Sequence, residues 1–276
     1  MQMLRLLGVV ALLALHAVGV AAQDLDTRGT PAGGLDQDQA FAYSQAAVGR
    51  TLGDYRFRDR HGRTLSLSEL RGRPLVISLI YTSCYHTCPM VTSHLAKVVK
   101  VARDALGQDS FAVLTVGFDT PVDSPERMSI FAAQRHIEDP DWYFLSTDAE
   151  TIERLSHDVG FLYVSSPKGF DHLIQSTVVD AGGKTYRQVY GEVFEAPLLV
   201  EPLKELLYGK AAATSAVKRW VNNVRLICTV YDPTTGRYHF DYSLFVGIAA
   251  GLLSLGAIAA FLVHAWRGSK PPLTRS

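Results

Sequence analysis

The sequence is short of cysteine and of net charge, and each shortage excludes a class of protein. Only three cysteines occur in 276 residues, so the chain is not a disulfide-stabilised scaffold. The 27 basic residues are balanced by 27 acidic ones, which leaves no charge excess of the kind that binds nucleic acid. A chain of this length with 47% hydrophobic residues can nevertheless bury a sizeable core in one or two domains.

One long stretch near the C-terminus contains no acidic residue, lysine or arginine. Leu244 to Ala265 holds only His264 as a titratable residue, and it is long enough to cross the hydrocarbon core of a bilayer. Arg267 and Lys270 follow it, which places the C-terminal tail in the cytoplasm by the positive-inside rule. We therefore predict a transmembrane helix at 242–266, a cytoplasmic tail at 267–276, and the preceding chain on the outer face.

A second apolar run lies at the N-terminus, directly after Arg5. It extends from Leu6 to Val20 and ends in the small residues Ala21 and Ala22, which suit a signal-peptidase site. An uncleaved anchor is the alternative, but the run is shorter than the ~20 residues that a membrane span needs. We predict a signal peptide at 1–22 and a flexible leader at 23–44, which lacks hydrophobic periodicity.

The pattern from residue 45 to 210 alternates between strands and helices. Leu75 to Tyr81 is apolar almost without interruption, which indicates a central strand covered on both faces. A helical pattern at 90–106 and a second buried strand at 111–116 follow, so a parallel crossover is expected. The prediction is an α/β fold with a central sheet and flanking helices. Its other elements are hairpins at 54–67 and 173–190, a helical turn at 68–74, helices at 125–136, 149–159 and 196–208, and a strand at 142–145.

Two cysteines lie where the central strand turns into the helix that follows it. Cys84 and Cys88 are separated by one helical turn, so both sulfur atoms can face one point in space. The partial positive charge of a helix N-terminus favours thiolates. Two thiolates select a soft metal, chiefly Cu(I), or zinc, and they also serve thiol redox chemistry. The pair therefore indicates a metal site or a redox site.

A metal site of this kind needs a third ligand, and His172 is the best placed histidine. It ends the loop 168–172 just before a predicted hairpin strand, from which it can reach the end of the sheet. The alternative is a histidine that only packs in its loop. His86, between the cysteines, is expected to point outward, although ligation by it stays open. His94 is expected to be exposed or partly buried on its helix, and no supporting pattern surrounds His61, His136 and His157.

Other polar residues near the end of the second buried strand have structural explanations. Ser124 suits a helix N-cap before Pro125, and Asp119 and Asp123 are candidates only for groups that support the ligands. The segment 211–241 is expected to be a juxtamembrane linker with a hairpin in its second half. Cys228 lies in this linker, and we expect it to pack rather than to act as a third reactive thiol.

These motifs together resemble the Sco/SenC family of membrane-anchored copper chaperones for cytochrome c oxidase. The resemblance covers about residues 50 to 208, and its motifs are the run 75–81, Cys84-x-x-x-Cys88-Pro89, the acidic segment 119–126 and Asp171-His172. It implies a thioredoxin-like fold and copper binding by Cys84, Cys88 and His172. The chain departs from the family in residues 85–87, where members often have a proline and an acidic residue, and in its C-terminal anchor.

The leading interpretation is therefore a chaperone in the bacterial inner membrane, with its main domain on the periplasmic face. It would bind Cu(I), with Cu(II) left open, and deliver it to the dinuclear copper centre of cytochrome c oxidase. Expected partners are the copper-bearing oxidase subunit and other copper carriers or thiol reductases. The alternative is a thiol–disulfide oxidoreductase with Cys84 as attacking and Cys88 as resolving thiol, forming a Cys84–Cys88 disulfide.

Overall fold

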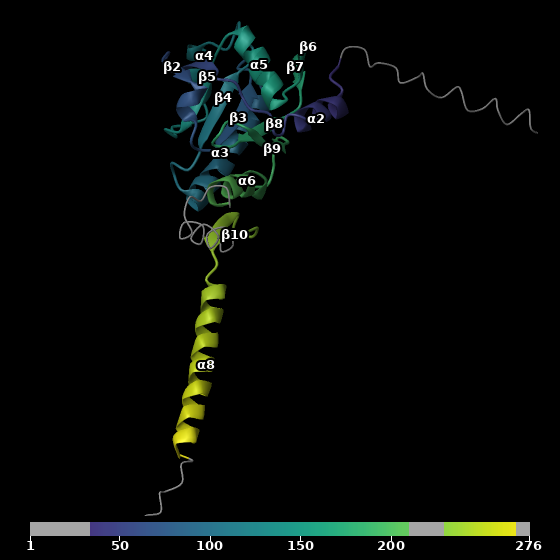
Figure 1. The fold of residues 1–276 in the computed structure, drawn as a ribbon. Helices are drawn as coiled ribbons and strands as arrows, with labels where there is room; N and C mark the ends of the chain where they lie inside the picture. Colours follow the sequence, from purple (N-terminus) through teal and green to yellow (C-terminus); the bar gives the residue numbers. More distant parts are fainter. Residues whose placement is uncertain (1–33, 210–228, 269–276) are drawn as a thin grey trace, which may run out of the picture.

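The computed structural model describes residues 34–209 and 229–268 of the chain (Figure 1). Its centre is a seven-stranded sheet in the order β2-β1-β5-β4-β3-β8-β9. The three middle strands run parallel to one another, and the outer strands pair antiparallel. The strands are β1 (Arg56–Asp59), β2 (Thr64–Ser66), β3 (Leu75–Ile80), β4 (Ala112–Gly117), β5 (Trp142–Ser146), β8 (Gln175–Val179) and β9 (Thr185–Tyr190).

Helices flank this sheet, as the sequence predicted. Every residue of β3 and β4 is buried, which explains why neither strand alternates between polar and apolar residues. The crossover between them is α3 (Thr87–Leu106), and α6 (Pro197–Tyr208) packs beside it. Three further helices of this domain are η1 (Leu67–Leu70), α4 (Pro125–Ala133) and α5 (Ala149–Val159). The predicted α/β class with a central sheet is confirmed.

Two helices differ from the expectation. The helix predicted to reach His136 ends at Ala133, and His136 adopts a φ of 52°, which a right-handed helix does not contain. The leader expected to be flexible through residue 44 contains α2 (Gln37–Gln45). Contacts with β9 hold this helix, since the Gln45 amide donates to the Tyr190 hydroxyl at 2.7 Å. The predicted signal peptide lies outside the described residues and stays a prediction.

A second region follows the sheet domain and leads to the C-terminal helix. A hairpin of β10 (Thr229–Asp232) and β11 (Arg237–Phe240) forms where the linker hairpin was predicted. After it, α8 (Ser243–Gly268) contains 22 residues, Phe245–Trp266, with a mean hydropathy of 2.4. This helix is long and apolar enough to be the predicted membrane anchor. Cys228 lies outside the described residues.

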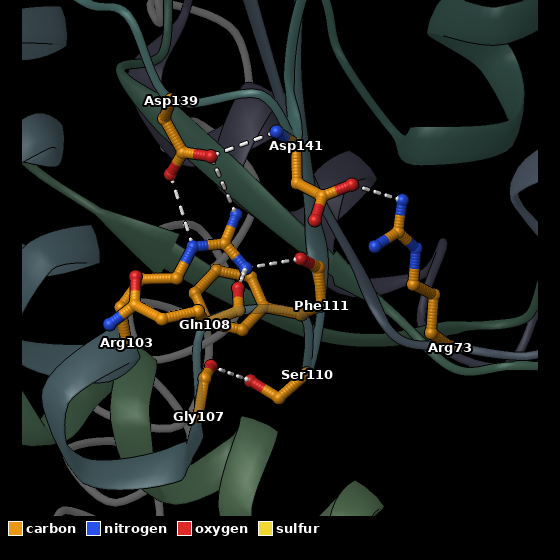
Figure 2. Close-up of polar contacts among 8 residues, drawn as sticks. All are labelled: Arg73, Arg103, Gly107, Gln108, Ser110, Phe111, Asp139 and Asp141. Carbon is orange, nitrogen blue, oxygen red and sulfur yellow. Dashed lines mark hydrogen bonds and ion pairs between the residues drawn. The ribbon is translucent and has the colours of Figure 1, made fainter.

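The C-terminal end of α3 is fixed to the sheet by a buried arginine (Figure 2). The Arg103 guanidinium pairs with Asp139 at 3.0 Å and donates to the Phe111 carbonyl at 2.6 Å. The Asp139 carboxylate also accepts from the Asp141 backbone, and Asp141 pairs with Arg73. Because the buried charge is both paired and hydrogen-bonded, this cluster is explained as structural. It holds in place the helix whose opposite end carries the cysteines.

Candidate metal centre

Cys88 lies in the first turn of α3, and Cys84 lies in the short connection between β3 and α3. Cys88 is 2% exposed, whereas Cys84 is partly exposed, and both thiols are free. The Cys88 backbone N–H donates to the Cys84 sulfur at 3.3 Å. An unpaired amide of the first helical turn thus points at the sulfur of Cys84, as expected for a thiolate at a helix N-terminus.

The environments of the two thiols shift their pKa values in opposite directions. Burial by itself raises the pKa of Cys84, but hydrogen bonds from the backbones of Cys88 and His86 and from the Tyr81 hydroxyl outweigh it and lower that pKa. Burial raises the pKa of Cys88, and the neighbouring Cys84 thiolate adds to the shift. Cys84 therefore ionises more readily than Cys88 and is the first of the two to react with a metal ion or a disulfide.

This asymmetry predicts selective alkylation of the reduced protein. Iodoacetamide at neutral pH is expected to modify Cys84 at least about tenfold faster than Cys88, because the thiolate is the nucleophile. The rate at Cys84 should reach half its maximum at a pH below that of an ordinary cysteine. Peptide mass spectrometry after timed quenching measures both rates, and unfolding in urea should make them equal. Equal rates in the folded protein would contradict the assignment.

His172 faces the same cavity as Cys84. This cavity of about 280 Å³ is also lined by Tyr81 and Phe170 and by residues at the start of α2. His172 is the last residue of β7 (Gly169–His172), which pairs with β6 (Tyr163–Ser166) in a small hairpin that the sequence did not predict. The hairpin, rather than the expected loop, therefore brings the imidazole to the cysteine turn.

The surroundings of His172 favour its neutral, metal-binding form. Its Nδ1 lies 3.1 Å from the Leu173 carbonyl, so this nitrogen carries the proton and Nε2 keeps the lone pair. Burial lowers the pKa of the imidazole, and the Leu173 carbonyl opposes the shift. The rings of Phe161, Phe118 and Tyr81 surround the imidazole, with centroids 5.3, 5.7 and 6.2 Å away. These rings restrict its orientation.

The structure links the three predicted ligands only in pairs and does not arrange them as a finished site. Within residues 34–209 and 229–268, no group of three or more His, Cys, Asp or Glu side chains is placed to hold a metal ion. The structure joins Cys88 to Cys84 by a hydrogen bond and joins Cys84 to His172 through one cavity. Two sulfur donors and one neutral imidazole are a donor set that fits Cu(I). The three-ligand set stays a prediction.

The remaining histidines lie where a role as ligand has little support. His86 precedes α3 and is exposed, as expected for a side chain that points outward, and the adjacent Tyr85 is 96% exposed. His94 is partly buried, and its Nε2 lies 2.8 Å from the carbonyl oxygen and 3.1 Å from the backbone nitrogen of Phe194, which ties α3 to the segment before α6. The histidines without a supporting pattern are all exposed: His61, His136 and His157.

The buried carboxylate of Asp123 stabilises the segment that leads into Cys84. Asp123 is 1% exposed and accepts from the backbone N–H and the hydroxyl of Thr82 at 2.8 and 2.6 Å, and from the Asp119 N–H at 2.9 Å. Gly117 makes room for it, since a Cβ there would lie 2.5 Å from the Asp123 Cβ. Burial raises the pKa of Asp123. Ser124, by contrast, caps α4 as predicted.

Tyr81 is a site residue that the sequence reading missed. Burial and the nearby Cys84 sulfur raise the pKa of Tyr81 to about 12. Gly169 packs against it, because a Cβ at that position would lie 2.9 Å from the Tyr81 hydroxyl oxygen. Its position at the end of an apolar run made it look like one more core residue.

The comparison with protein families agrees with this geometry. The SCO1/SenC family model matches residues 44–207. The chain belongs to the SCO1/SenC family. A curated relative, the SCO1 protein homolog of Bacillus subtilis (strain 168), is 25% identical over an alignment of 172 residues, and the match covers 57% of this chain and 87% of the relative.

Solved structures confirm the thioredoxin-like, Sco-type fold. BsSco, described as a member of the Sco family of cytochrome c oxidase assembly proteins in which a disulfide switch was identified, is 20% identical. It covers 57% of this chain and 94% of its own, with a TM-score of 0.50. A SCO1/SenC family lipoprotein of Bacillus anthracis str. Ames is 22% identical. The match covers 57% of this chain and 95% of the lipoprotein, with a TM-score of 0.52.

Proposed function

We propose that this protein is a membrane-anchored copper chaperone that binds Cu(I) through Cys84, Cys88 and His172. The observation that carries the proposal is the cavity that Cys84 shares with His172, together with the Cys88 backbone N–H that donates to the Cys84 sulfur. The partly exposed Cys84 thiolate is the entry point for the ion. Its binding must release the proton of the buried Cys88 thiol, so affinity is expected to fall as the pH is lowered.

The delivery step follows from the family and from the C-terminal helix. Members of the Sco family take part in the assembly of cytochrome c oxidase, and α8 fits a membrane anchor. The proposed acceptor is the copper-bearing subunit of that oxidase, reached from the periplasmic face of the bacterial inner membrane. Other copper carriers or thiol reductases would load copper or keep the two cysteines reduced.

A second function is favoured by the unequal thiols. A partly exposed thiolate beside a buried thiol of raised pKa suits a thiol–disulfide oxidoreductase. Cys84 would attack a partner disulfide and form a mixed disulfide, which Cys88 then resolves. The partner gains two electrons and two thiols, and the chain is left with a Cys84–Cys88 disulfide that a thiol reductase must reduce.

The change His172→Ala separates the two functions. It should weaken Cu(I) binding at least about tenfold, because the imidazole completes the donor set, while His86→Ala should leave it unchanged. The affinities are measured by competition with a Cu(I) chelator on the reduced protein. Disulfide reduction by the same variant should be close to that of the parent. Parent-like copper affinity in His172→Ala would contradict the three-ligand site and leave the oxidoreductase as the better account.

A further inference from the structure

The β10–β11 hairpin is held against the sheet domain by a buried lysine of α6. Lys204 is 4% exposed, and its ammonium donates to the Thr229 carbonyl of β10 at 2.5 Å. Its charge is balanced by Glu201, 3.4 Å away, which also accepts from the Tyr238 hydroxyl of β11 at 2.9 Å. If the hairpin moved away, Lys204 and Glu201 would each lose a hydrogen-bond partner, so these two contacts hold the hairpin in place.

The same hairpin is continuous with the apolar helix. Only Asp241 and Tyr242 separate β11 from α8, and the Asp241 carboxylate accepts from the Ser243 N–H at 2.8 Å, at the start of α8. The ring of Phe240, the last residue of β11, stacks on Phe245 with centroids 6.0 Å apart. Phe245 is the first residue of the candidate membrane span. The connection leaves little freedom between the hairpin and the span.

Helix α3 sets the distance between the hairpin and the cysteines. Residues 104–107 at its C-terminal end form, with Tyr208 and hairpin residues, a cavity of about 520 Å³, while Cys84 and Cys88 lie at its N-terminal end. Its 20 residues span about 30 Å at 1.5 Å per residue. In Figure 1, β10 lies at the α6 end of the domain towards α8, and β6 and β7 lie at the far end.

We infer that the β10–β11 hairpin is a rigid adaptor that fixes the sheet domain on α8 and presents the Cys84 cavity away from the membrane. This inference rests on the proposed function. The protein that accepts copper would present its own site at a distance from the lipid surface of about the length of α3. A site on a flexible tether would instead sample all heights, including the lipid surface. The adaptor therefore determines which partners can reach the cysteines.

Single-molecule energy transfer on the full chain in lipid nanodiscs tests the adaptor. A fluorescent amino acid replaces Lys168, an exposed residue in the β6–β7 turn, and the acceptor dye is attached to lipid headgroups. The expected result is one narrow population with low transfer. Combining Lys204→Met with Tyr238→Phe should broaden the distribution and raise the mean transfer, because both polar contacts of the hairpin are removed. Lys97→Met, at an exposed position of α3, is the matched control.

A broad distribution in the parent would overturn the inference, and so would a double variant that matches the parent. If the double variant does not fold, Tyr238→Phe alone, which removes one hydroxyl of the hairpin, is compared with the parent under the same two criteria. Copper titration of the same chains separates this proposal from the proposed function. Stoichiometry should be unchanged in the variants, and a parent that binds no copper but gives a narrow population would refute the chaperone and keep the adaptor.

Discussion

Replacing Cys84 by serine is expected to abolish high-affinity Cu(I) binding. The sulfur of Cys84 is the partly exposed thiolate that receives a helix N–H and shares a cavity with His172. A serine hydroxyl stays protonated near neutral pH and is a hard oxygen donor, so it replaces neither the charge nor the softness of the thiolate. We expect the Cu(I) affinity to fall by more than about a hundredfold. This loss exceeds the one usual for a residue that only hydrogen-bonds to a metal ligand.

The measurement is a competition titration of the reduced chain with a Cu(I) chelator. Cys228 supplies the control, because the change Cys228→Ser removes a thiol that the sequence assigns to packing. The control should bind copper like the parent. Parent-like affinity in Cys84→Ser, or loss of binding in Cys228→Ser, would show that the ion is held by other groups.

Replacing Asp123 by alanine is expected to damage both stability and copper binding. The change leaves the Thr82 N–H, the Thr82 hydroxyl and the Asp119 N–H without their buried acceptor. The change removes hydrogen bonds to a charged group and leaves their donors buried without a partner. We therefore expect the free energy of unfolding to fall by about 3 kcal/mol. Because Thr82 lies two residues before Cys84, the turn should also lose order, and copper affinity should fall about tenfold.

Asp123→Asn is the matched variant for this prediction. Its side-chain oxygen can still accept from Thr82, whereas its amide group would face the Asp119 N–H, so it should lose less stability than the alanine variant. Urea unfolding of the domain with reduced cysteines measures the difference. The account of Asp123 would be wrong if alanine cost no more than asparagine, or if copper affinity were the same in all three proteins.

The elements that the sequence predicted correctly are those whose pattern lies in neighbouring residues. The apolar run at 75–81, interrupted only by Ser78, predicted the central strand, and α5 begins and ends at the predicted residues because Asp148 caps it and Gly160 takes the left-handed conformation after it. Helix α2 was missed because its residues show little amphipathic pattern and it depends on contacts with Tyr190. Only the folded chain brings these contacts together.

The same distinction applies to the site. The spacing of Cys84 and Cys88 predicted their common turn, and His172 was selected from its place before a strand. The β6–β7 hairpin was missed although Pro167-Lys168-Gly169 between two short polar-aromatic segments is a turn signal. The contact of Asp123 with Thr82 joins two segments that are 41 residues apart, so no local pattern predicts it.

X-ray absorption spectroscopy of the copper-loaded, reduced full chain tests the central claim most directly. The account predicts one Cu(I) ion per chain with two sulfur ligands and one imidazole nitrogen, and loss of the nitrogen signal in His172→Ala but not in His86→Ala. A first coordination shell without sulfur, or a spectrum identical in the parent and in His172→Ala, would contradict it.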